Sequence, residues 1–204
     1  MKNRFYPTLT LILFGAFLFA HFGCASSPTP RFYLLSPLTT TGSELKPPAD
    51  ERCLSIGIGP IKIPGYLDQA QIVTRSTANE LTLAEFDRWA EPLKENFTRV
   101  LSQNLSMLLC TKTVVVFPWR GTIPVDYRIE TDVLRFDGIL GGHVSLEAWW
   151  RVFSGDGRTM LLARKSDLSE PAGGGGYKSL VSAQGRTLEK LSREIAEAIK
   201  TLPQ

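Results

Sequence analysis

Residues with catalytic chemistry are sparse in this chain. His143, beside a glycine-rich turn, would have to serve as the base of a Ser–His–Asp triad, and nothing near it points to the other two members. Three carboxylates, Asp126, Glu130 and Asp132, lie at even spacings on one expected strand, where two of them would suit acid–base catalysis. Acidic residues at a period of two more often mark the solvated face of a sheet. We therefore predict that the protein is not an enzyme.

Metal and nucleotide sites are also unsupported by the sequence. Histidine ligands are lacking, and Cys53 and Cys110 stand too far apart for the paired spacing of a zinc finger. The string GGGGYKS at residues 173–179 has the lysine and serine of a phosphate-binding loop. However, Tyr177 replaces the glycine that must precede the lysine. The sequence predicts no cofactor and no metal.

The first 24 residues predict export and lipidation. Lys2 and Arg4 precede an almost wholly apolar run, residues 9–22, which Gly23 and Cys24 follow. A charged start, a short apolar run and a small residue at the cleavage point are typical of an export signal. The run is shorter than the roughly 20 residues that span a bilayer. We expect residues 1–23 to be a signal peptide and Cys24, placed as in a bacterial lipobox, to carry the lipid; the alternative is an uncleaved anchor helix.

The residues after Cys24 bear on the compartment. Ala25 and Ser26, with no aspartate, resemble outer-membrane rather than inner-membrane sorting. We therefore expect a lipid-anchored protein on the periplasmic face of the outer membrane, held in the lipid through the acylated Cys24. Disulfides form outside the cytoplasm, and lipidation of Cys24 leaves an even number of cysteines. This favours a bridge between Cys53 and Cys110, with two buried free thiols as the alternative.

The charge balance excludes one class of partner. The chain has 23 basic and 20 acidic residues, and the basic excess falls almost to nothing once Lys2 and Arg4 are removed with the signal peptide. A near-neutral mature chain has no electrostatic footprint for nucleic acid. We expect no nucleic-acid partner.

The elements that must position these residues predict an α/β fold. We expect a single domain in which a mixed, largely antiparallel sheet packs with two long helices. Apolar stripes at steps of three and four predict helices from Pro92 to Leu108 and over residues 177–202. Apolar runs and alternation predict strands at 31–36, 54–59, 61–63, 71–75, 80–83, 114–117, 125–136, 144–152 and 158–169.

Finer features of these strands can also be predicted. Val114–Phe117 is continuously apolar, as a strand buried on both faces would be. The alternation shifts phase at Leu134 and Phe136, which predicts a bulge or twist. Gly57 and Gly59 leave one strand face bare, where a helix or backbone could approach closely. The last three strands should form an antiparallel meander.

Several strings stand in fixed order along the chain: RFYLL at 31–35, IGP at 58–60, PGYLD at 64–68, QIVTR at 71–75, NEL at 79–81, RWAEPL at 88–93, DYR at 126–128 and the segment 183–195. Together they resemble the PqiC-type lipoproteins, also described as auxiliary lipoproteins of ABC-type transport systems. The resemblance covers nearly all of residues 24–202. It divides the chain into a lipidated tether with a short strand and loop (24–52) and an ABC-type transport auxiliary lipoprotein domain (53–204).

The resemblance implies a non-catalytic outer-membrane lipoprotein. Its partner would carry MCE domains and form a periplasmic bridge for lipid traffic between the two membranes. A stand-alone lipid- or ligand-binding lipoprotein is the alternative, which an enclosed apolar cavity would favour. Whether the protein forms a homo-oligomer stays open.

Candidate partner-binding residues come from two places in the sequence. Tryptophan, tyrosine and arginine favour interface centres. The candidates are Tyr66, Asp68, Arg75, Arg88, Trp89, Glu91 and Trp149. The first six would equally hold the hairpin to the first helix through an arginine–carboxylate pair. Trp149 alternates with polar residues opposite Val144, Leu146 and Trp150, which predicts that it lies outside the meander core; otherwise the second helix covers that face.

Overall fold

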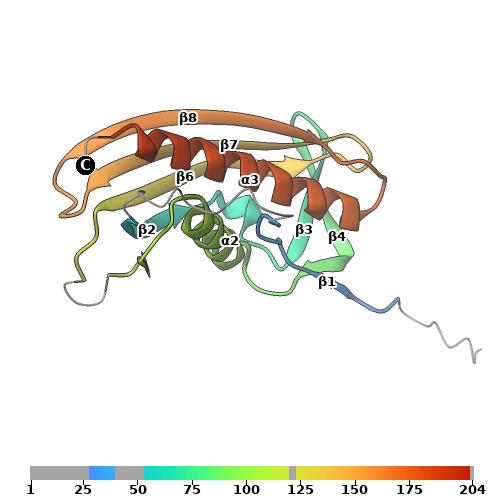
Figure 1. Cartoon of the computed structure of the whole chain (residues 1–204). Helices are drawn as coiled ribbons and strands as arrows, with labels where there is room; N and C mark the ends of the chain where they lie inside the picture. Colours follow the sequence, from blue (N-terminus) through green and yellow to red (C-terminus); the bar gives the residue numbers. More distant parts are fainter. Residues whose placement is uncertain (1–27, 40–52, 120–122, 203–204) are drawn as a thin grey trace, which may run out of the picture.

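The computed structural model describes residues 28–39, 53–119 and 123–202 (Figure 1). The elements are β1 (Arg31–Tyr33), β2 (Ser55–Lys62), the short 3-10 helix η2 (Gly65–Leu67), β3 (Gln71–Thr77), β4 (Glu80–Trp89), α2 (Leu93–Leu108), β5 (Thr113–Val116), β6 (Tyr127–Gly138), β7 (His143–Ser154), β8 (Met160–Pro171) and α3 (Tyr177–Lys200). The predicted signal peptide and Cys24 lie outside the described residues. Within those residues, no helix has the length and apolarity of a membrane span.

The strands of the described ranges form two sheets where the sequence predicts one. The larger has the order β5-β2-β6-β7-β8, and the smaller has the order β1-β4-β3. β2 runs parallel to β5 and β6, whereas β6, β7 and β8 form the predicted antiparallel meander. The smaller sheet arises because β1 pairs parallel with β4, the second strand of the predicted hairpin. The α/β class and the two long helices are confirmed.

Helices α2 and α3 cover one face of the larger sheet (Figure 1). The sheet side chains on that face are buried, among them Ile58, Ile129, Leu146 and Trp150. The Phe97 ring of α2 meets the Phe136 ring of β6 edge-on, with centroids 5.5 Å apart. The core is therefore filled by large apolar side chains, whose removal from water is the main stabilising contribution to the fold.

The phase shift in β6 marks a bulge, as predicted. The pairing of β6 with β7 changes register between Val133 and Arg135. Leu134, the residue inside the bulge, is exposed although Val133 and Phe136 are buried. A bulge re-aims a side chain in this way because two residues oppose one on the partner strand.

Two predictions around β5 are wrong. β5 is an edge strand, not a strand buried on both faces, because β2 alone pairs with it in the sheet. Val116 and the following Phe117 are exposed. The bare face of β2 contacts aromatic side chains rather than a helix or the backbone of another strand. A Cβ on Gly57 would lie 2.8 Å from the Trp119 ring, and one on Gly59 would lie 2.7 Å from Phe117 Cβ. Glycine at these positions makes room for the aromatic pair.

Cys53 and Cys110 are joined by a disulfide, with their Cα atoms 4.8 Å apart. The bond ties the start of β2 to the end of α2, and the backbone N–H of Lys112 donates to the carbonyl of Leu54 (2.8 Å) beside it. The closed loop therefore contains β2, the hairpin and α2.

The segment that follows β1 is fastened to both helices. Leu35 and Leu38 are buried in the core. The backbone N–H of Leu38 donates to Asn104 Oδ1 of α2 (2.8 Å), and Asn104 Nδ2 donates to Ser192 Oγ of α3 (3.0 Å). One buried amide thus joins three segments that are distant in sequence.

Candidate docking surface

Two of the predicted partner-binding residues, Tyr66 and Arg75, bind a buried carboxylate. Tyr66 Oη donates to Asp137 Oδ2 (2.8 Å), and Arg75 donates through Nε to Oδ1 (3.0 Å) and through Nη2 to Oδ2 (2.8 Å). Arg135 Nε also donates to Oδ1 (3.0 Å). Asp137 is fully buried in β6. This cluster therefore joins the smaller sheet to the larger one, rather than to α2 as the sequence suggested.

The hydrogen bonds to Asp137 decide its charge state. Burial alone would raise the pKa of Asp137, but the hydrogen bonds from Arg75, Tyr66 and Arg135 outweigh it, so the pKa is lowered from its usual value. Burial and the bond to Asp137 raise the pKa of Tyr66 to about 12. The bond to Asp137 likewise raises the pKa of Arg75. The site holds an ionised aspartate with two cations and a neutral phenol, an arrangement that supports structure.

The remaining residues of this group do not form one surface. Trp89 is 5% exposed and belongs to the core, so the prediction that it faces a partner is wrong. Glu91 accepts two hydrogen bonds from Arg99 of α2, from Nη2 (2.9 Å) and Nε (3.1 Å). This pair holds the end of the hairpin to α2, as the alternative prediction had it. Arg88 is half-buried and Asp68 is exposed.

A second buried aspartate, Asp87 of β4, escaped the sequence analysis. Arg31 Nη2 donates to Asp87 Oδ2 (2.8 Å), and Tyr33 Oη donates to Oδ1 (2.7 Å). Burial alone would raise the pKa of Asp87, but these two bonds lower it on balance. Only the pairing of β1 with β4 brings the three residues together, and neither strand pattern alone signals it.

Trp149 lies on the uncovered face of the larger sheet and is 42% exposed. The alternative that the second helix covers this face is wrong, because α3 packs against the opposite face, where Trp150 is buried. In the strand ladder Trp149 stands between Asp132 of β6 and Lys165 of β8. We call this exposed tryptophan, with Leu134 and the surrounding charges, the Trp149 face.

Ion pairs surround the Trp149 face. Arg151 Nη1 donates to Asp132 Oδ2 (2.7 Å), and Lys62 Nζ lies 3.5 Å from Asp132 Oδ1. Lys165 Nζ donates to Glu147 Oε2 (3.3 Å). An exposed aromatic side chain within a ring of paired charges matches the anatomy of protein interfaces, which have an aromatic centre and a polar rim.

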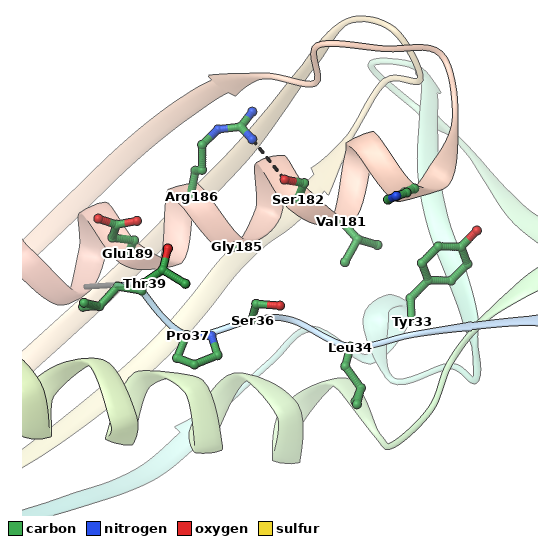
Figure 2. Close-up of a pocket in the computed structure, with 12 residues that line it drawn as sticks. Tyr33, Leu34, Ser36, Pro37, Thr39, Val181, Ser182, Gly185, Arg186 and Glu189 are labelled. Atoms are coloured by element: carbon green, nitrogen blue, oxygen red, sulfur yellow. Dashed lines mark hydrogen bonds between the residues drawn. The ribbon is translucent and has the colours of Figure 1, made fainter. Parts of the chain in front are cut away.

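Two grooves lie on the other side of the molecule. Figure 2 shows the first, about 390 Å³, where residues 33–39 run alongside α3. Its Arg186 is already bound, since Nη1 donates to Ser182 Oγ (3.2 Å) and Nε to Glu170 Oε2 (2.8 Å). The second, about 540 Å³, lies between α2, β2 and β5 and includes Val116 and Phe117.

Two of the three carboxylates considered for catalysis have structural partners. Asp126 Oδ2 accepts a hydrogen bond from the backbone N–H of Ser55 (2.7 Å), and Asp132 forms the ion pairs above. His143 is exposed at the start of β7. Across residues 28–39, 53–119 and 123–202, no three His, Cys, Asp or Glu side chains gather as a metal site would require.

Comparison with known proteins identifies relatives over most of the chain. Residues 33–196 match the family described as ABC-type transport auxiliary lipoprotein components. The chain is 23% identical over 181 residues to the intermembrane transport lipoprotein PqiC of Escherichia coli (strain K12), covering 89% of this chain and 92% of that protein. PqiC of Shigella flexneri gives the same values.

Solved structures share the fold. A crystal structure of an uncharacterised protein has a TM-score of 0.66 at 21% identity and covers 84% of this chain and 99% of its own. A protein of Xanthomonas campestris also has a TM-score of 0.66, at 15% identity, with 83% and 94% covered. Both likenesses concern the arrangement of the elements.

Proposed function

The chain belongs to the family of ABC-type transport auxiliary lipoprotein components, and we propose on this basis that it is the outer-membrane subunit of an intermembrane lipid transport system. In this proposal the acylated Cys24 holds it on the periplasmic face of the outer membrane. There it docks a partner that carries MCE domains. The observation that carries the proposal is the alignment with an intermembrane transport lipoprotein over 92% of that relative's length.

The Trp149 face is the surface that we propose for docking. The mature chain is near neutral, so long-range attraction contributes little and contact must rest on apolar and aromatic side chains. Trp149 is exposed among ion pairs. The opposite charges in each pair largely cancel, so the face has little net electrostatic potential. A tryptophan in this setting is the residue type most often found at an energetic centre of an interface.

The filled core favours docking over a stand-alone ligand-binding role. Bulky residues such as Ile129, Leu146 and Trp150 occupy the space between the larger sheet and the helices. Sites that enclose a lipid or drug-sized ligand are instead concave and lined by apolar groups that leave room for it.

The test is a co-purification of the MCE-type partner in mild detergent with the Trp149→Ala variant. We expect capture to weaken by about 2 kcal/mol, roughly 30-fold in affinity. The melting temperature should stay nearly unchanged because the ring is exposed. Leu83→Ala, an exposed apolar change on β4 of the smaller sheet, is the matched control and should capture normally.

Each contrary result has a distinct meaning. A large drop in melting temperature would assign Trp149 to the core. Normal capture by a stable Trp149→Ala protein would move the docking surface elsewhere. Failure of the unaltered lipoprotein to retain an MCE-type protein would reject the docking role.

A further inference from the structure

Exposed apolar side chains gather at the end of the domain where α3 begins. Ile139 and Leu140 form the tip of the turn between β6 and β7, and both are exposed. Phe32 of β1 is 63% exposed. The turn, the start of α3 and β1 all lie at the same end of the molecule in Figure 1, opposite the turn between β7 and β8.

The turn contacts the connector before α3, and β1 lines a groove together with the start of α3. The backbone N–H of Ala172 donates to the carbonyl of Gly142 (2.8 Å), and a Cβ on Gly141 would lie 3.7 Å from Gly175 Cα. The turn therefore packs against the glycine-rich connector that leads into α3. Lys178, in the first turn of α3, lines the same groove as Tyr33 of β1. We call Phe32, Ile139 and Leu140 the apolar end.

Chain length limits how far the apolar end can lie from the lipid. Phe32 follows Cys24 by only eight positions. At roughly 3.3–3.6 Å per residue, its Cα lies at most about 29 Å from that of Cys24. Helix α3 has 24 residues, so it is about 36 Å long and leads away from this end. The tether thus joins the domain at the end where its apolar side chains are exposed.

We propose that the apolar end rests on the phospholipid leaflet into which the acylated Cys24 is anchored, with Ile139, Leu140 and Phe32 at the boundary of headgroups and acyl chains. The proposal rests on the lipid anchor of the proposed function. Apolar side chains bind a membrane at this depth when cations beside them meet the lipid phosphates. Lys178 is an exposed cation at this end, and the side chain of Arg31 is also exposed although it pairs with Asp87. The domain then stands with α3 pointing away from the membrane.

This orientation leaves the Trp149 face free. Trp149 lies midway along β7, and β7 runs from the apolar end to the opposite end of the molecule (Figure 1). The larger sheet would therefore stand upright on the leaflet. Its uncovered face would be open to a partner that approaches from the side.

The test places an environment-sensitive fluorophore on the lipidated protein in phospholipid vesicles. Leu140→Cys carries the probe at the apolar end, and Met160→Cys carries it at the exposed β7–β8 turn as the matched control. We expect the probe at residue 140 to shift to the blue and to be quenched by spin-labelled lipids, at a depth of about 5–10 Å. The probe at residue 160 should show neither effect. Radiolabelled palmitate on the unaltered chain and on Cys24→Ala reports the anchor independently.

The outcomes separate the two proposals. Normal palmitate incorporation with an unquenched probe at residue 140 would overturn the membrane-contact proposal alone. Equal quenching at residues 140 and 160 would also overturn it, because the domain would then lie flat. Equal palmitate labelling of the unaltered chain and Cys24→Ala would contradict the anchor that both proposals assume.

Discussion

Asp87 and Asp137 are bound by the same kinds of side chain, a tyrosine and arginine, but they fasten different parts of the molecule. Asp137 is fully buried, and its partner Arg75 has a side chain that is only 19% exposed. The side chain of Arg31, the cation on Asp87, is 66% exposed. Asp137 joins the two sheets, whereas Asp87 holds the three-residue strand β1 to β4.

The difference shows how burial changes the contribution that an arginine–aspartate pair makes to stability. An exposed cation is screened by water, so its ion pair contributes little. A cation withdrawn from water beside a buried carboxylate interacts more strongly, and each is costly to leave without the other. We therefore expect the domain to depend strongly on Asp137 and less on Asp87, although both have a lowered pKa.

The largest effect should come from Asp137→Asn. The substitution keeps the shape but leaves Arg75 and Arg135 without a compensating charge, so the free energy of unfolding should fall by about 3 kcal/mol. Urea unfolding of the purified protein measures it. Asp167→Asn, an exposed change on β8, is the control and should stay within about 0.5 kcal/mol. A loss at Asp137 as small as that of the control would remove the distinction between the two clusters.

Asp87→Asn should be milder. It weakens charge-assisted hydrogen bonds to Tyr33 and to an arginine that water also solvates, so a loss of about 1.5 kcal/mol is expected. Susceptibility of β1 to protease under native conditions gives a second readout and should rise in this variant. The same unfolding series compares it with Asp137→Asn, and the reverse order of the two losses would contradict our ranking.

The smallest expected effect is a difference between the two variants in how their stability falls at low pH. Both aspartates have a folded-state pKa below the usual value, so the stability they contribute is present above the unfolded pKa of about 3.9. It is lost as the pH falls through the lower folded values, because the unfolded chain then binds protons first. We expect the free energy of unfolding to fall below about pH 4. The fall should be shallower in Asp137→Asn than in Asp87→Asn. If the curves of both variants run parallel to that of the unaltered protein, neither carboxylate drives the fall.

The individual helices and strands could be predicted because each depends on the pattern of apolar residues in a short stretch of sequence. Steps of three and four identified α2 and α3, and the phase shift at Leu134 identified the bulge of β6. The position of Trp149 on the uncovered face also followed from alternation along β7. These features depend on which side of one element is apolar, and periodicity carries that information.

Features that depend on pairing between elements distant in sequence could not be predicted. A run of valines such as Val114–Val116 is compatible with a central or an edge strand, and only the order of the sheet decides. The division into two sheets depends on the parallel pairing of β1 with β4. Asp137 stands just before a glycine turn and has the pattern of a turn residue, so nothing local revealed that Tyr66 and Arg75 bind it. Trp89 was misplaced for the same reason, since its burial depends on elements outside its own strand.

The fastening of residues 31–38 bears on how the domain responds to tension. If Cys24 carries the proposed lipid, a pull on the chain from the membrane enters the fold at β1 and reaches Leu38, whose backbone is bound to Asn104 of α2. If this segment yields, the next point to take the load is Cys53, and its bond to Cys110 passes the force to the end of the same helix. Both points of loading converge on α2, which is packed in the core against α3. Beyond the short strand β1, mechanical stress is thereby carried to the centre of the molecule rather than along the strands of the larger sheet.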